Sequence, residues 1–229
     1  MTTSLRLVCL IILKLITQIK FIYTMKIAII GTGNVGGALA KRFADANHTI
    51  LLGVRNTDDF KGKELLNYSN KISALSILSA VQQAEVIIIS VPAQFAIETA
   101  QFLGDVSGKV IIDTMNGVFM KPEGFNNTAD AILANCNCTD VVKCFNTTGY
   151  ENIINPIYKG QGIDMFTAGS SEKGIAVATL LAKEIDFENV YHFGGNDKFN
   201  LIEQMAMCWI NLAIIQKQGR DMAFKIIRR

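Results

Sequence analysis

Several residue types on which whole classes of site depend are scarce in this sequence. Its 229 residues include two histidines and five cysteines, an odd number without the paired spacing of a disulfide framework or a zinc site. The closest cysteine pair, Cys136 and Cys138, has no second pair of ligands after it. We interpret the cysteines as free or structural thiols of a cytoplasmic protein, and we expect no metal site.

Charge and long apolar runs are also scarce. The 22 basic and 20 acidic residues give a formal net charge of +2 without a basic run, which argues against a nucleic-acid partner. The longest apolar run, Leu7–Leu13, is much shorter than the about 20 residues that cross a bilayer, so we expect no stable membrane insertion.

Familiar catalytic groupings are missing too, since we find no Ser-His-Asp order and no carboxylate pair. We therefore assign no catalytic residue. His48 precedes the second predicted strand and is interpreted as a solvated surface residue. For His192, on the last predicted strand, a ligand-facing position is the minor alternative.

Residues 1–24 differ in character from the rest of the chain. A signal peptide, a basic amphipathic anchor and an upstream translation product are the alternatives. We favour the last, with Met25 as the true first residue, because Met25 leads directly into the first predicted strand. In each case we expect this leader to lie outside the fold.

The stretch 25–56 organises the chain. An apolar run at 26–30 predicts a buried parallel strand, and Gly31, Gly33 and Gly36 follow in the spacing G-x-G-x-x-G. The first glycine permits the tight turn, the second lets a pyrophosphate approach the backbone, and the third lets helix and strand pack closely. The predicted helix 34–46 directs its N-terminal amides at that phosphate. This context predicts a dinucleotide site.

The end of the second predicted strand, 49–52, favours NADP over NAD. An NAD site normally carries an acidic residue there, whereas this chain has Arg55 and Asn56. A guanidinium can hold a 2′-phosphate through two hydrogen bonds. The alternative is that Arg55 is an ordinary solvated turn residue.

The remaining pattern alternates strands and helices, which predicts an α/β, doubly wound Rossmann fold with a mostly parallel sheet. Ser90, Val91 and Pro92 end one strand, at the edge where such sheets bind ligands. Asn116 follows another, as a contact to the nicotinamide ribose or as a turn residue. Further strands are predicted at 73–76, 85–91, 109–113, 140–145, 164–168 and 190–193, and further helices at 78–83, 92–103, 128–135, 171–185 and 197–218. The last helix is too apolar for one solvated helix, so we expect it to pack on the domain and on a partner chain, with a Met-rich pocket face as the alternative.

Five motifs resemble one family, the NADP oxidoreductases that depend on the deazaflavin coenzyme F420. They are GTGNVGGALA, LGVRN, SVP, KCFNTTGYENIINPIY and WINLA. The resemblance covers nearly all of 25–229 and none of 1–24, and extends more weakly to the cytosolic domain of six-transmembrane ferric reductases. It implies a homodimer with a small C-terminal lobe and a long terminal helix. It also implies hydride transfer between NADPH and a flavin-like small-molecule acceptor, a deazaflavin or a flavin.

The resemblance also implies roles for individual residues. Thr32, Gly33, Asn34 and Val35 would hold the pyrophosphate, Arg55 and Asn56 the 2′-phosphate, Ser90, Val91 and Pro92 would flank the nicotinamide, and Asn146, Thr147 and Thr148 would lie where the acceptor meets it. The chain departs from the family at Val54, where a small serine is common. We expect an NADP-binding domain over 25–145 and an acceptor and dimerisation lobe over 146–229.

Two other functions stay open. One is a dehydrogenase or reductase of hydroxy acids or imines. Such enzymes generally need a larger helical substrate domain that bears a lysine, and only about 80 residues follow Thr148 here. The other is a non-catalytic sensor that binds NADP and reports its redox state to a partner.

Overall fold

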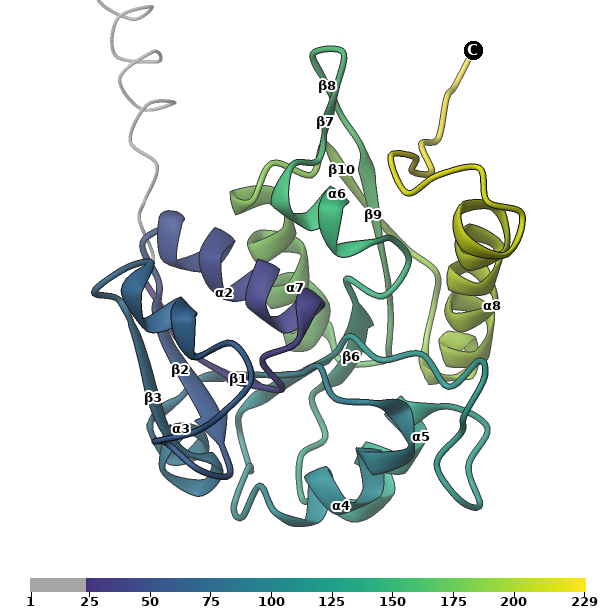
Figure 1. Ribbon diagram of the computed structural model, residues 1–229. Helices are drawn as coiled ribbons and strands as arrows, with labels where there is room; N and C mark the ends of the chain where they lie inside the picture. Colours follow the sequence, from purple (N-terminus) through teal and green to yellow (C-terminus); the bar gives the residue numbers. More distant parts are fainter. Residues whose placement is uncertain (1–23) are drawn as a thin grey trace, which may run out of the picture.

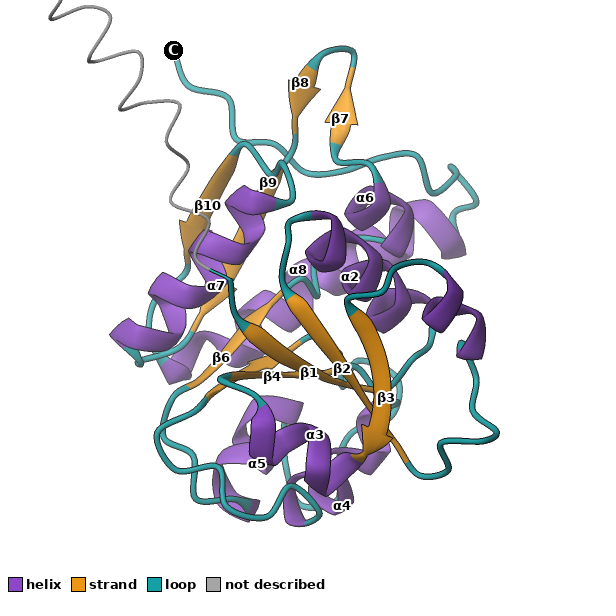
Figure 2. Ribbon diagram, turned by 90° about the vertical axis from the view of Figure 1, so that its left-hand side faces the viewer, coloured by secondary structure: helices purple, strands orange, loops and turns teal. Residues whose placement is uncertain are grey.

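The computed structural model describes residues 24–229, so the expectation for the leader lies almost wholly outside the described chain (Figure 1). An eight-stranded sheet runs in the order β10-β9-β6-β5-β4-β1-β2-β3 between two layers of helices (Figure 2). None of the helices in the described part has the length and apolar content to span a bilayer.

The elements follow one another as strand, helix, strand through most of the chain. The strands are β1 Lys26–Ile30, β2 Thr49–Val54, β3 Ile72–Ser76, β4 Val86–Ile89, β5 Val110–Asp113, β6 Val141–Cys144, β7 Ile157–Tyr158, β8 Gln161–Gly162, β9 Asp164–Ala168 and β10 Asn189–His192. The α-helices are α2 Asn34–Asp45, α3 Ile77–Gln83, α4 Ala96–Gln101, α5 Thr128–Asn135, α6 Tyr150–Ile154, α7 Glu172–Glu184 and α8 Phe199–Ile210. Single-turn helices precede α4 and α8, a 3-10 helix spans Lys63–Asn67, and a π-helical turn, Asn211–Ile215, ends α8.

The sheet is mostly parallel, as predicted. The neighbours in the run β3-β2-β1-β4-β5-β6 all pair in parallel. The one antiparallel pair of the large sheet joins β6 to β9. The central strands β1, β4 and β5 are buried almost throughout, which explains why they read as continuous apolar runs. The strand order reverses between β1 and β4, and at such a switch point open α/β sheets bind their ligands.

Helices cover both faces of the sheet. In Figure 2, α2, α6 and α7 lie on one side of it and α3, α4 and α5 on the other. Two apolar cores follow, and the second includes Phe199 and Ile202 from α8. The terminal helix therefore packs on its own domain, as expected, and whether it also meets a partner chain stays a prediction.

Three local predictions were wrong. β2 runs two residues further than predicted, because Gly53 lies inside the strand: a Cβ there would be 2.3 Å from the Ile30 Cδ1. The segment 150–162, for which the sequence predicted neither a helix nor a strand and a loop over 153–162, contains α6 and the β7–β8 hairpin that projects at the top of Figure 1. The last helix ends at Ile215 instead of residue 218.

The interpretation of His48 as a solvated residue was also wrong. Its side chain is fully buried, its Nδ1 accepts the Met25 amide at 3.1 Å, and its Nε2 lies 2.8 Å from a carboxylate oxygen of Glu184. The histidine therefore joins the start of β1 to the end of α7. His192, in contrast, is exposed at the end of the edge strand β10.

Residues after α8 pack back onto the domain as an irregular tail. The Trp209 indole and the Asn152 amide both donate to the main-chain oxygen of Met222, each at 2.7 Å. The Arg220 guanidinium binds both carboxylate oxygens of Glu151 and lies 5.3 Å from the Trp209 ring centre. The tail is thereby fastened to α6, the helix that follows Thr148.

Acid is expected to loosen this tail. Burial, the largest single effect, raises the pKa of Glu151, but the hydrogen bonds and charge of Arg220, with hydrogen bonds from the main chain and from Tyr150, together outweigh it, so the pKa lies below the ordinary 4.5. A carboxyl with a lowered pKa stabilises the fold above its unfolded pKa and stops doing so as pH falls through the lowered value. Between about pH 5 and pH 3 the emission of Trp209, the single tryptophan, should therefore change. Arg220→Ala should abolish that transition; an unaltered transition in this variant would contradict the assignment.

Candidate functional site

The carboxyl ends of five neighbouring parallel strands bring the predicted site residues to one edge of the sheet. Gly31 follows β1, Arg55 follows β2, Ser90 follows β4, Asn116 lies after β5 and Asn146 lies after β6. Residues as far apart in the sequence as 31 and 146 thus lie at the same edge of the sheet. Individual roles there stay predictions.

The glycine turn at the switch point is tightly packed at two of its three glycines. Gly31 has a φ of +101°, and a Cβ there would lie 2.2 Å from the main-chain oxygen of Ser90. At Gly36 a Cβ would lie 1.9 Å from the main-chain oxygen of Gly31. At Gly33, however, a Cβ would meet nothing within 4 Å. The fold itself explains the first and third glycines, whereas the second has open space beside it, and its predicted role in the approach of a pyrophosphate stays a prediction.

The start of α2 is suited to an anion. Gly33 caps the helix without any side-chain hydrogen bond, Asn34 is exposed and Val35 is half-buried. The first amides of a helix have no partner within it, and they lie at the positive end of its dipole. With the open space at Gly33, this turn fits a pyrophosphate.

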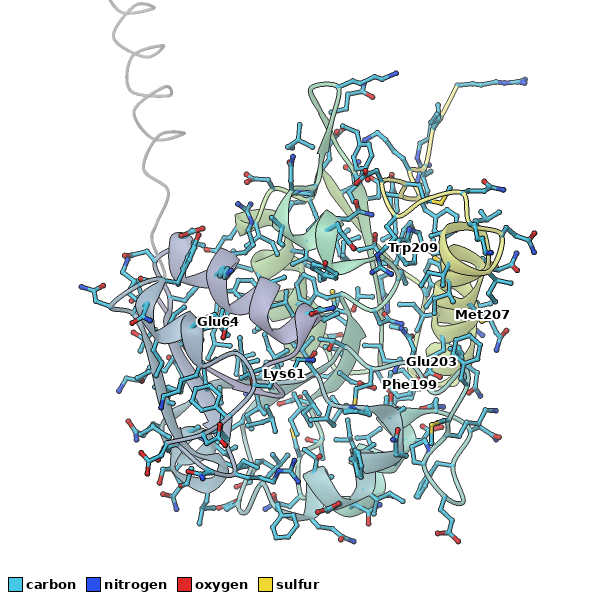
Figure 3. The ribbon with its side chains drawn as sticks, in the orientation of Figure 1. Lys61, Glu64, Phe199, Glu203, Met207 and Trp209 are labelled. Carbon is cyan, nitrogen blue, oxygen red and sulfur yellow. The ribbon has the colours of Figure 1, made fainter. Side chains whose placement is uncertain are left out.

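A loop after β2 closes over the same turn. The Thr32 hydroxyl donates to the main-chain oxygen of Lys61, whose position beside the start of α2 is visible in Figure 3. At Gly62, φ is +88° and a Cβ would lie 2.6 Å from the main-chain oxygen of Thr32. Lys61 and Gly62, at the end of this loop, therefore lie against the glycine turn.

Arg55 is exposed directly after the last residue of β2. Asn56 is exposed as well, and its side-chain oxygen accepts the Asp58 amide at 2.9 Å, which leaves its NH₂ group available. Val54 is buried. A guanidinium and an amide NH₂ therefore stand at the strand end where a dinucleotide's adenosine ribose is held, and both can donate to a phosphate.

Polar residues of the next strands form a second group. Ser90 and Val91 are half-buried, and Pro92 is exposed. The Asn116 side-chain NH₂ donates to the main-chain oxygen of Asn146 at 2.8 Å, and the Asn146 side-chain NH₂ donates to the Asn116 Oδ1 at 2.9 Å. Asn116 bridges two loops and also lies at the carboxyl edge of the sheet. The geometry is therefore compatible both with a turn residue and with a contact to the nicotinamide ribose.

The three residues predicted at the acceptor differ in exposure. Asn146 and Thr147 are buried, and the Thr147 hydroxyl lies 3.9 Å from the sulfur of Met165. Thr148 is half-buried, and its hydroxyl accepts the Asn152 amide at 2.7 Å. Thr148 is therefore the most accessible of the three.

Behind this edge lies a buried charge cluster that the sequence analysis missed. The Lys143 ammonium on β6 is 2.7 Å from a carboxylate oxygen of Asp113 and 2.7 Å from one of Glu203, and all three side chains are buried. Burial raises the pKa of Asp113 despite the neighbouring ammonium. A charged residue within an apolar strand, as in VVKC, and a lone glutamate within an apolar helix were the available signals.

A polar cavity of about 280 Å³ adjoins the cluster. It is lined by Gly117, Val118, Lys121, Asn126, Asn200, Glu203 and Gln204. Ligand sites for molecules of drug size usually have roughly 300–1,000 Å³. This cavity alone is therefore small for a tricyclic ring, although it begins one residue after Asn116.

Comparisons with known proteins agree with the geometry. Residues 26–117 match the family described as NADP oxidoreductase, coenzyme F420-dependent. The F420-dependent NADP reductase of Methanothermobacter thermautotrophicus is 26% identical over 212 residues, which cover 84% of this chain and 91% of that protein. A candidate F420-dependent NADP reductase structure from Arthrobacter sp. FB24 superposes with a TM-score of 0.76 at 24% identity, over 89% of this chain and all of that one.

More distant structures share the fold alone. The reductive aminase from Aspergillus terreus, solved with NADPH, has a TM-score of 0.59 at 18% identity, over 81% of this chain and 60% of that chain. Together the comparisons confirm the predicted fold class and the predicted family resemblance. The class of enzyme, an NADP-dependent oxidoreductase, is confirmed with them.

Two glycine variants separate folding from ligand binding. In Gly33→Ala the free energy of unfolding should stay within about 0.5 kcal/mol of the wild-type value, because the added Cβ meets nothing. The same variant should bind NADPH at least about 10-fold more weakly. Gly36→Ala should be destabilised by about 2 kcal/mol or more, because its Cβ meets a main-chain oxygen. Chemical denaturation and NADPH titration measure the two effects. Wild-type affinity in Gly33→Ala would show that the pyrophosphate lies elsewhere.

Proposed function

From the match of residues 26–117 to the NADP oxidoreductase family that depends on coenzyme F420, we propose that the chain transfers a hydride between NADP(H) and a planar, flavin-like acceptor. The proposal is carried by three features together: the open space at Gly33, the start of α2 that no side chain caps, and the exposed Arg55 directly after β2. A dinucleotide needs the first two features, and a 2′-phosphate needs the third.

The cofactor, when bound, supplies the reactive hydride, and the chain's own residues bind and orient it. Thr32, Gly33, Asn34 and Val35 would hold the pyrophosphate. Arg55 and Asn56 would hold the 2′-phosphate, with Asn56 able to replace the donor that the family's serine provides. Transfer between stacked rings depends on position more than on proton transfer.

The acceptor is assigned to the region beyond the nicotinamide. Ser90, Val91 and Pro92 would flank the nicotinamide, with Asn116 near its ribose, and Asn146, Thr147 and Thr148 would border the acceptor. The relative from Methanothermobacter acts with F420 according to its name, which supports a deazaflavin, with a flavin as the related possibility. By the same likeness we propose a cytoplasmic homodimer whose lobe 146–229 contributes the acceptor site and the contact between subunits.

The imine or hydroxy-acid alternative receives no support from the buried lysine. Lys143 has no solvent exposure, and two carboxylates and two further oxygens surround its ammonium, so it is not accessible to a substrate. The sensor alternative differs from an enzyme only in turnover, and an assay separates the two.

Removing the charge at Arg55 should change the choice of cofactor. In Arg55→Ser, NADPH affinity should fall about 10- to 100-fold, the effect of losing charge-assisted hydrogen bonds, while NADH affinity should stay within about 2-fold. Lys159→Ser, which removes an exposed positive charge at the tip of the β7–β8 hairpin, is the matched control and should change neither. Fluorescence titration with both nucleotides measures this. An unchanged ratio in Arg55→Ser would contradict the 2′-phosphate assignment.

Turnover tests the acceptor. Purified protein with NADPH and F420, FMN or FAD in turn should oxidise NADPH with at least one of them, which the nicotinamide absorbance band reports. Saturable NADPH binding without oxidation by any of the three would contradict the proposed hydride transfer and favour the sensor.

A further inference from the structure

The Lys143 ammonium has no solvent exposure and four oxygen atoms around it. Besides Asp113 and Glu203, it donates to the Thr128 hydroxyl at 2.8 Å and to the main-chain oxygen of Met115 at 3.0 Å. These partners come from β5 and the loop after it, from α5 and from α8. One side chain therefore joins elements that are up to 90 residues apart in the sequence, from 113 to 203.

The cluster forms hydrogen bonds with the main chain of the loop after β5 on both sides of Asn116. The Met115 amide donates to an oxygen of Asp113 at 2.8 Å, and the main-chain oxygen of Met115 accepts from Lys143. The Gly117 amide donates to the second oxygen of Glu203 at 3.0 Å. In Figure 3, Glu203 and Phe199 are labelled on the side of α8 that faces the domain. Asn116 is thus fixed by the residues on either side of it.

Hydrogen-bond chemistry then determines which atom of each side-chain amide, in Asn116 and in Asn146, is the oxygen and which is the NH₂. The main-chain oxygen of Asn146 can only accept, so the Asn116 group beside it must be the NH₂. The Asn116 oxygen consequently faces the Asn146 side chain and requires its NH₂. The Asn146 Oδ1 is left buried without a hydrogen-bond partner in the described chain. Its preceding residue, Phe145, has a φ of +62°, which is unusual for a residue other than glycine.

We propose that Lys143 and Glu203 are positioning residues, which set the Asn116–Asn146 pair for the nicotinamide end of the cofactor. This inference rests on the proposed function and adds residues to it that touch neither cofactor nor acceptor. The unpartnered oxygen of Asn146 suits a ligand that donates a hydrogen bond, as the carboxamide NH₂ of nicotinamide does. Because Glu203 belongs to α8, the terminal helix takes part in arranging the cofactor edge.

A purely structural role predicts something different. If the cluster only stabilised the fold, its loss would weaken all parts of the cofactor site equally or none of them. A positioning role predicts a loss confined to the nicotinamide end, since the hydrogen bonds and ion pairs of the cluster within residues 24–229 involve neither the glycine turn nor Arg55. The two ends can be measured apart, because 2′,5′-ADP carries the 2′-phosphate and no nicotinamide.

Glu203→Gln is the decisive variant. The glutamine side chain has one oxygen and one NH₂, so its NH₂ must face another donor, either the Gly117 amide or the Lys143 ammonium. One of the two interactions that hold the loop is therefore lost. The affinity for 2′,5′-ADP should stay within about 2-fold of wild type, and the additional affinity of NADPH over 2′,5′-ADP should fall about 10-fold. Glu172→Gln, the same change at an exposed position on α7, should alter neither.

A double-mutant cycle tests whether the effect passes through Asn116. If it does, Glu203→Gln should cost little further affinity in an Asn116→Ala background. Should Glu203→Gln not fold, Thr128→Val removes the hydroxyl shared by Lys143 and both carboxylates and is measured in the same way, with a smaller loss expected. Additive losses in the cycle would overturn the proposal.

The outcomes separate this inference from the proposed function. A wild-type protein that binds neither 2′,5′-ADP nor NADPH would overturn the proposed function, and the positioning role with it. Wild-type binding of both, with a Glu203→Gln variant that loses equal affinity for the two or loses none for NADPH, would overturn the positioning role alone.

Discussion

A buried ammonium between two buried carboxylates is the interaction on which the carboxyl edge of the sheet depends. Lys143, Asp113 and Glu203 are removed from water, and such burial is tolerated only when each charge is compensated and hydrogen-bonded. Removing one partner of a buried ion pair typically costs about 3–5 kcal/mol, because a bare charge is left behind. The cluster therefore ties β5, β6, α5 and α8 together and holds the loops that carry the polar edge.

The other constraint is the close approach of main chains at the glycine turn. Gly31 touches the end of β4 and Gly36 touches Gly31, so β1, α2 and β4 meet without side chains between them. The start of α2 thereby lies directly after β1 at the switch point, where the first amides of a helix can bind an anion. The fold requires glycine at 31 and 36, and the proposed cofactor site adds Gly33 to them.

Much of the fold could be predicted from the sequence, since parallel strands buried on both faces appear as apolar runs and the glycine spacing marks their turn. The errors arose where distant residues decide. His48 is buried because Glu184 and the Met25 amide meet it, and no local pattern reveals that. Lys143 reads as one polar residue in a strand until Asp113 and Glu203 are brought beside it. Gly53 looks like a strand end, whereas the packing of Ile30 makes it part of β2.

The central claim is that this edge binds a dinucleotide carrying a 2′-phosphate. The most direct measurement is an equilibrium titration of the unmodified protein with NADPH and with NADH, followed through nicotinamide fluorescence in the same buffer and salt. We expect NADPH to bind at least about 10-fold more tightly than NADH. Equal affinities, or tighter binding of NADH, would contradict it.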